Sequence, residues 1–157
     1  MTTHQLSAAA HQRLTREYHD LTTRGRIEVA EKIERAREMG DLKENGDYHA
    51  AKDEQGHMEG RIRQLEAILG DAEIVPLAPA GIVGFGAIVT VLYHGESDSE
   101  RFLIGHVEER PADENVSVMS PSSPLGSALL GAKRGATVSY EAPNGKLRVK
   151  VLDTQTP

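Results

Sequence analysis

A chain of 157 residues with 38% hydrophobic residues is long enough for one domain or two small ones. It has no cysteine, which excludes disulfides and thiolate metal sites, and no apolar run near the length of a membrane span. The formal charge is −6, with 11 basic and 15 acidic residues in 1–75 and 7 and 9 in 76–157. We therefore expect a cytoplasmic protein without membrane contact and without strong binding of free nucleic acid, which needs a basic surface.

The first half of the chain shows two helical repeats. From Tyr48 to Leu69 the seam positions alternate in steps of three and four, the heptad pattern of a coiled-coil helix. A second, less regular seam precedes it, and Gly25 interrupts it. If the two helices are antiparallel, they bend near residues 43 and 44, with Val29 opposite Met58 and Gly25 opposite Ile62. The sequence thus predicts an antiparallel two-helix coiled coil as an N-terminal domain over 1–75, with its tip near 41–47.

The second half of the chain changes to a period of two. Residues 76–80 read as a linker, and 81–157 as a second domain. Ser123 and Pro124 are suited to begin a short helix. The predicted fold class is α+β, with a small antiparallel sheet and one short helix in the C-terminal domain. The strands are expected at 86–95, 100–107, 115–120, 136–142 and 146–153, the last two joined by a "PNG" hairpin turn.

The predicted bend carries the carboxylates Asp41, Glu44 and Asp47. Carboxylate oxygens are suitable ligands for Mg²⁺, but so few of them need further ligands from elsewhere. A second interpretation is structural, because Asp41, Asn45 and Asp47 are also typical of the start of a helix. From the pattern alone the structural interpretation is favoured.

Four basic residues flank the same bend: Arg35, Arg37, Lys43 and Lys52. They are suited to a phosphate or a nucleic-acid end, although ordinary salt bridges with Glu34, Glu38 and Asp53 would explain them equally well. The seven histidines lack the spacing of a zinc site. His49 is interpreted as a capping or packing residue beside Tyr48.

Several stretches of the chain are similar to one known family. "AREMGDLKENGDYHAAKDEQGHMEGRIRQLEAIL" (36–69) resembles the tip and second helix of the bacterial Gre transcript-cleavage factors, GreA type, and "LTREYHDL" (14–21) resembles their first helix. "SPSSPLGSALLGAKRG" (120–135) and "YEAPNGKLRVKVL" (140–152) resemble their C-terminal domain. The resemblance covers nearly the whole chain in the expected order.

This resemblance implies an FKBP-like C-terminal domain that docks on bacterial RNA polymerase, and a coiled coil that enters the secondary channel. It implies an accessory factor, expected to be monomeric, that stimulates the polymerase's own hydrolysis of backtracked nascent RNA. Asp41 and Glu44 would be the catalytic acids and would hold an Mg²⁺ that is shared with the polymerase and not stably bound without it. By the same resemblance, Arg37 and Lys52 lie near the RNA 3′ end. The implied docking residues are Ser120, Pro121, Ser123, Pro124, Leu125 and Gly126.

Two other functions remain open at this point. One is a channel-binding regulator that inhibits or modulates polymerase without transcript cleavage. The other is an FKBP-like isomerase with a coiled-coil dimerisation arm, against which stands the scarcity of aromatic residues in 81–157. The aromatic residues there are Phe85, Tyr93, Phe102 and Tyr140.

Overall fold

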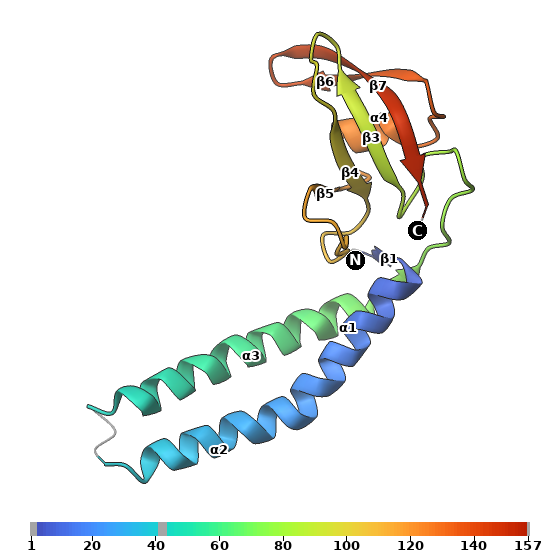
Figure 1. Cartoon of the computed structure of the whole chain (residues 1–157). Helices are drawn as coiled ribbons and strands as arrows, with labels where there is room; N and C mark the ends of the chain where they lie inside the picture. Colours follow the sequence, from blue (N-terminus) through green and yellow to red (C-terminus); the bar gives the residue numbers. More distant parts are fainter. Residues whose placement is uncertain (1–2, 41–43, 157) are drawn as a thin grey trace. The chain divides into compact units, whose positions relative to one another are not determined.

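The computed structural model of the chain describes residues 3–40 and 44–156 (Figure 1). It divides into two compact units. The helical unit is His11–Ala72, and the globular unit joins Thr3–Ala10 to the chain from Glu73 onward. In the described part of the chain, no helix has the length and apolar character needed to cross a membrane.

The helical unit is a helical hairpin, as predicted. Its first arm consists of α1 (Ala8–Asp20), a π-helical turn (Leu21–Gly25) and α2 (Arg26–Arg37), and α3 (Gly46–Gly70) returns beside it (Figure 1). The 25 residues of α3 span about 37 Å at 1.5 Å per residue. Facing apolar residues close the seam between the arms. Those that are buried are Leu14, Val29, Ala36, Ala51, Ile62, Leu65 and Ile68.

The first arm of the hairpin is irregular at Gly25. A Cβ atom on Gly25 would lie 3.1 Å from Sδ of Met58, so the Met58 side chain packs against this glycine, and the predicted pairing of Gly25 with Ile62 stays a prediction. Gly25 is the last residue of the π-helical turn. The i→i+5 hydrogen bonds of this turn are wider than those of an α-helix, so they change which residues after the turn face the other arm. The heptad pattern of α3 carried no information about this irregularity, which lies in the other arm.

Ion pairs join the two arms along their exposed edges. Arg26 pairs with Glu59 and Lys32 with Glu54, each at 2.9 Å. Exposed pairs of this kind stabilise a fold by less than about 1 kcal/mol each. The hairpin therefore depends on its apolar seam, and these pairs contribute mainly to the choice of register.

The globular unit contains a five-stranded sheet in the order β5-β4-β3-β7-β6. The five predicted strands are all present, and the expected hairpin joins the last two, with Ala142 paired to Gly145. The sheet is mixed rather than purely antiparallel, because β5 pairs with β4 in parallel. A period of two locates strands but cannot give the direction of their partners. The bounds are β3 Ile88–Tyr93, β4 Glu100–Ile104, β5 Val116–Met119, β6 Thr137–Ala142 and β7 Gly145–Gln155.

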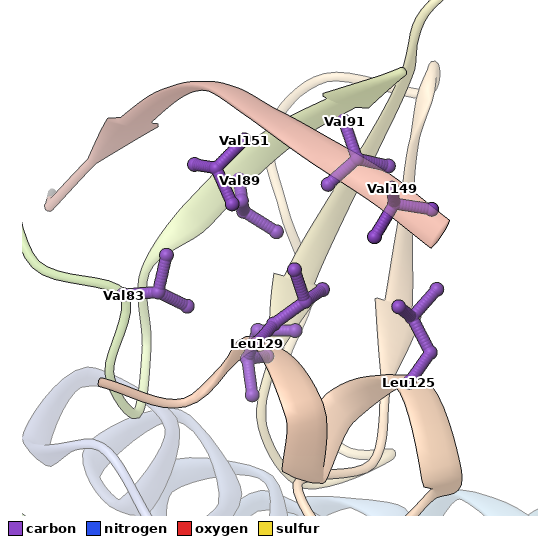
Figure 2. Packing of buried hydrophobic residues seen from close by; sticks show 8 residues of the cluster. Val83, Val89, Val91, Leu125, Leu129, Val149 and Val151 are labelled. Atoms are coloured by element: carbon purple, nitrogen blue, oxygen red, sulfur yellow. The ribbon is translucent and has the colours of Figure 1, made fainter. Parts of the chain in front are cut away.

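One short helix, α4 (Pro124–Leu129), packs on this sheet. As predicted, Ser123 caps it, with Oγ accepting a hydrogen bond from the Gly126 N–H at 3.0 Å. Figure 2 shows Leu125 and Leu129 pointing from α4 toward the valines of the sheet. This cluster is the core of the globular unit. Its buried members are Val83, Val89, Val91, Ile104, Leu125, Leu129, Val149 and Val151.

The N-terminal segment belongs to the globular unit, whereas the sequence interpretation assigned all of 1–75 to the helical domain. Strand β1 (His4–Leu6) pairs with β2 (Ala72–Ile74). Ser7 caps α1 by accepting the Ala10 N–H at 3.1 Å, and its own N–H and Oγ donate to the carboxylate of Glu109 at 2.8 and 2.9 Å. In a local capping box the acid comes from the third helical residue, which here is Ala10. Glu109, 102 residues away, supplies it instead.

A histidine pair lies beside this cap. His4 Nδ1 and His106 Nε2 are 2.9 Å apart, and His106 Nδ1 accepts the Glu108 N–H at 3.0 Å. The bond from Glu108 leaves Nε2 of a neutral His106 as the donor to His4. Burial, and next the proximity of His4, lower the pKa of His106, while Glu108 and Glu109 act in the opposite direction. The environment of His106 therefore favours its neutral form.

Candidate functional site

The predicted acidic tip lies at the bend between α2 and α3. Asp41 and Lys43 fall outside the described residues, so their predicted roles stay predictions. Glu44 is exposed, immediately before the first residues of α3. It lines an open hollow of about 430 Å³ together with Met39, Asn45, Gly46 and Asp47. The carboxylate of Glu44 is thus accessible to a ligand from outside the chain.

Asn45 and Asp47 have the structural roles that the second interpretation gave them. Asn45 is the N-cap of α3, and its side-chain oxygen accepts the Tyr48 N–H at 3.1 Å. Asp47 lies in the first turn, where a negative charge interacts favourably with the helix dipole. Neither residue needs a catalytic role to explain its presence.

Asn45 also makes a contact that the sequence did not predict. Its side-chain Nδ2 donates a hydrogen bond to the backbone carbonyl of Ala36, near the end of α2. That carbonyl also accepts the Met39 N–H at 3.2 Å. One side-chain amide therefore links the last turn of α2 to the first turn of α3.

Arg37, the last residue of α2, contacts the first turn of α3 as well. Its guanidinium carbon lies 5.9 Å from the ring centroid of Tyr48, within the range of a cation–π interaction. The ring of His49 packs edge-on beside Tyr48 at 5.6 Å, so His49 is the neighbour that was predicted. These contacts hold the Arg37 side chain against the first turn of α3.

Lys52 and Arg35 lie one to two turns further from the bend. Nζ of Lys52 donates to Oε1 of Gln55 at 2.9 Å, within its own helix. Arg35 lines a hollow of about 340 Å³ between α2 and α3. Across residues 3–40 and 44–156, none of Arg35, Arg37 and Lys52 forms a salt bridge with Glu34, Glu38 or Asp53. The alternative explanation by local salt bridges therefore does not hold for these residues.

The described part of the tip offers the exposed carboxylate of Glu44 as a possible metal ligand. Within the described part of the chain, no group of three histidine, aspartate or glutamate side chains is placed to hold a metal. Glu44 offers exposed carboxylate oxygens, the ligand type that Mg²⁺ prefers. A metal ion at Glu44 would therefore need further ligands, and the predicted Mg²⁺ role of the tip stays a prediction.

The predicted docking segment is a loop and the start of α4 in the globular unit. Ser120 and Pro124 are exposed, and Pro121 and Ser123 are half-buried. Leu125 is part of the core, and a Cβ on Gly126 would lie only 2.1 Å from the Ser120 carbonyl oxygen. The six residues therefore lie together in the structure, but only Ser120, Pro121, Ser123 and Pro124 reach the surface. Leu125 and Gly126 are buried and support the loop.

Family models match both units of the chain. The model described as "Transcription elongation factor, N-terminal" matches residues 4–74, and "Transcription elongation factor, GreA/GreB, C-term" matches residues 78–156. This chain belongs to the GreA/GreB family. Among curated members, "Transcription elongation factor GreA" of Saccharopolyspora erythraea is 50% identical over 142 residues, covering 89% of this chain and 86% of that protein. GreA of Rhodococcus erythropolis is 46% identical over 154 residues, covering 96% and 93%.

Solved structures of the GreA/GreB family also match the chain over its length. The GreA factor homolog Gfh1 of Thermus thermophilus is 26% identical and covers 98% of this chain and 99% of that one, with a TM-score of 0.45. A TM-score below 0.5 does not establish a shared fold. The family assignment therefore depends on the sequence matches, which extend over both units.

For this GreA/GreB member, sequence reasoning found the acidic bend but not the contacts that hold it. Two contacts join residues of different helices: the hydrogen bond from Asn45 Nδ2 to the Ala36 carbonyl, and the cation–π contact of Arg37 with Tyr48. One signal was available: Ser, Asp and Asn are similarly good N-caps, so the choice of an amide at position 45 is not explained by capping alone.

Proposed function

We propose that this protein is a transcription elongation factor that enters the secondary channel of RNA polymerase and stimulates Mg²⁺-dependent hydrolysis of backtracked nascent RNA. The observation that carries the proposal is the exposed Glu44 carboxylate at the bend of the hairpin, where the Arg37 guanidinium at the end of α2 lies over the Tyr48 ring of α3. Membership of the GreA/GreB family, with about half of the residues identical to a curated GreA, supports the same function. The protein acts as an accessory factor that completes the polymerase's own active site.

The chemistry divides between the two partners. Glu44, together with Asp41 by the family resemblance, supplies carboxylate ligands, and the polymerase supplies the RNA phosphate and the remaining ligands. When bound, Mg²⁺ activates the attacking water or stabilises the leaving oxygen. Arg37 is placed to attract the phosphate of the RNA 3′ end, and Lys52 adds positive charge one turn further along α3. The surface formed by Ser120, Pro121, Ser123 and Pro124 docks on the polymerase.

The test is RNA cleavage in a stalled, backtracked elongation complex. The wild-type protein is expected to shorten the RNA only when Mg²⁺ is present. Asp41→Asn and Glu44→Gln should suppress cleavage while still competing with wild type for polymerase. Asp53→Asn is the matched control, because Asp53 is an exposed acid on α3 that lies outside the tip.

Two results would contradict the proposal. Wild-type protein that binds polymerase but never shortens the RNA would identify a channel-binding regulator without cleavage. If Glu44→Gln loses binding along with cleavage, the carboxylate is part of docking rather than of the reaction.

A further inference from the structure

The oxygen and the nitrogen of the Asn45 side-chain amide form hydrogen bonds with two different helices. Oδ1 accepts the Tyr48 N–H at the start of α3, and Nδ2 donates to the Ala36 carbonyl at the end of α2. A helix leaves its last carbonyls and its first N–H groups without partners in the helix itself. One side chain therefore gives the Tyr48 N–H of α3 a partner and adds a second hydrogen bond to the Ala36 carbonyl of α2, which also accepts the Met39 N–H.

Asn45, which makes this bridge, is the direct neighbour of Glu44 in the chain. Residues 37–44 separate Ala36 from Asn45 along the sequence, and Glu44 is covalently bonded to Asn45. The Ala36 anchor is firm, because Ala36 is 4% exposed in the apolar seam. The Tyr48 anchor is firm too, since the Tyr48 ring contacts both Arg37 and His49. Glu44 is thus attached to a residue that is fixed on both sides, although its own side chain is exposed.

We infer that Asn45 is a positioning residue for Glu44: its amide ties α2 to α3 and thereby fixes the direction in which Glu44 presents its carboxylate to the shared metal ion. The inference rests on the function proposed above and adds a residue to it. Because few protein ligands hold the metal, small errors in their placement are costly, and misplacement by about 1 Å can reduce a rate by about 100-fold.

The alternative is that Asn45 is only a helix cap, and the side-chain chemistry separates the two roles. Serine and aspartate cap helices about as well as asparagine. Neither can donate to the Ala36 carbonyl in the same way, since serine is shorter and aspartate has no N–H group. Asn45→Ser and Asn45→Asp therefore retain the cap and lose the bridge, whereas Asn45→Ala loses both.

The experiment compares these variants with wild type in folding, polymerase binding and cleavage. Helix content of Asn45→Ser and its competition for polymerase should match wild type, and its urea midpoint should fall only slightly, by the loss of one hydrogen bond. Its single-turnover cleavage rate should fall about 10- to 100-fold, and half-maximal cleavage should need a higher Mg²⁺ concentration. Asn45→Asp keeps the side-chain length, lacks the donor and adds a charge, so a loss of cleavage in both Asn45→Asp and the uncharged Asn45→Ser is expected if the missing donor is the cause. A wild-type rate and Mg²⁺ dependence in Asn45→Ser would overturn the inference.

A fourth measurement needs no cleavage and separates this inference from the proposed function. The ¹⁵N order parameter of the Glu44 amide in the free protein should be lower in Asn45→Ser than in wild type, while that of the Ile62 amide stays the same. An unchanged value at Glu44 would refute the positioning role even in a protein that cleaves RNA. If wild type does not cleave, the proposed function fails, and the order parameter still decides whether Asn45 holds Glu44.

Discussion

Glu109 offers the sharpest test of how the N-terminal segment is attached. Its carboxylate is 8% exposed and accepts two hydrogen bonds from Ser7, at 2.8 and 2.9 Å. In Glu109→Gln the remaining oxygen can accept only one of the two bonds, and the new NH₂ group bonds to Ser7 only if the hydroxyl turns to accept from it, so neither bond keeps a charged acceptor. A hydrogen bond to a charged group contributes about 1.5–3 kcal/mol, so we expect the free energy of unfolding to fall by about 2–4 kcal/mol.

The assay is urea unfolding followed by far-UV circular dichroism, since the chain has no tryptophan. Glu114→Gln is the control: it makes the same charge change at an exposed position nearby. Ser7→Ala should cost more in the wild-type background than in Glu109→Gln, because in the latter mainly the cap to Ala10 remains to be lost. If Glu109→Gln is no more destabilising than Glu114→Gln, the carboxylate does not anchor the segment.

Three further perturbations address the globular unit. The fold lowers the pKa of His106. Below the ordinary histidine pKa of about 6.5, the unfolded chain therefore binds more protons than the folded one, and the free energy of unfolding should fall as the pH drops toward the folded pKa. Between pH 7.5 and 5.5, the urea midpoint of wild type should fall more than that of His106→Asn. Gly126→Ala should destabilise by more than about 2 kcal/mol, because its Cβ would lie 2.1 Å from the Ser120 carbonyl oxygen, and a thermal midpoint equal to wild type would contradict this. Leu129→Ala should cost about 2–5 kcal/mol by leaving a cavity under the sheet, measurable in the same urea assay.

Features that depend on neighbouring residues in the chain were predictable from the sequence. The helix of α3, the Ser123–Pro124 helix start and the "PNG" turn each depend on a few neighbouring residues, and each appears in the structure as expected. The seam of α3 differs only at its end, where Ile68 is buried and Leu69 is half-buried. The candidate site was predictable to the same extent: the carboxylates at the bend and the cap at Asn45 follow from local pattern.

Features that join distant parts of the chain were not predictable. The parallel pairing of β4 with β5 and the 102-residue link from Ser7 to Glu109 depend on tertiary packing. Ser7 carried a partial signal, because a serine cap without an acid at the third helical position leaves its own N–H without a local partner. The π-helical turn before Arg26 had an equally partial signal in the interruption of the seam at Gly25.

The tip shows why a residue with one sufficient explanation can still have a second role. Capping accounts for an Asn, Asp or Ser at position 45 equally well, so it explains the class of residue but not the amide. The hydrogen bond from Nδ2 to the Ala36 carbonyl favours asparagine over aspartate and serine. Only the amide group can accept the Tyr48 N–H of α3 and also donate an N–H to the Ala36 carbonyl of α2. A site with few carboxylates contributes little binding energy for a metal, and its main contribution to a shared reaction is then the fixed position of those carboxylates. The residue that fixes the position is accordingly as much a part of the proposed site as the carboxylate itself.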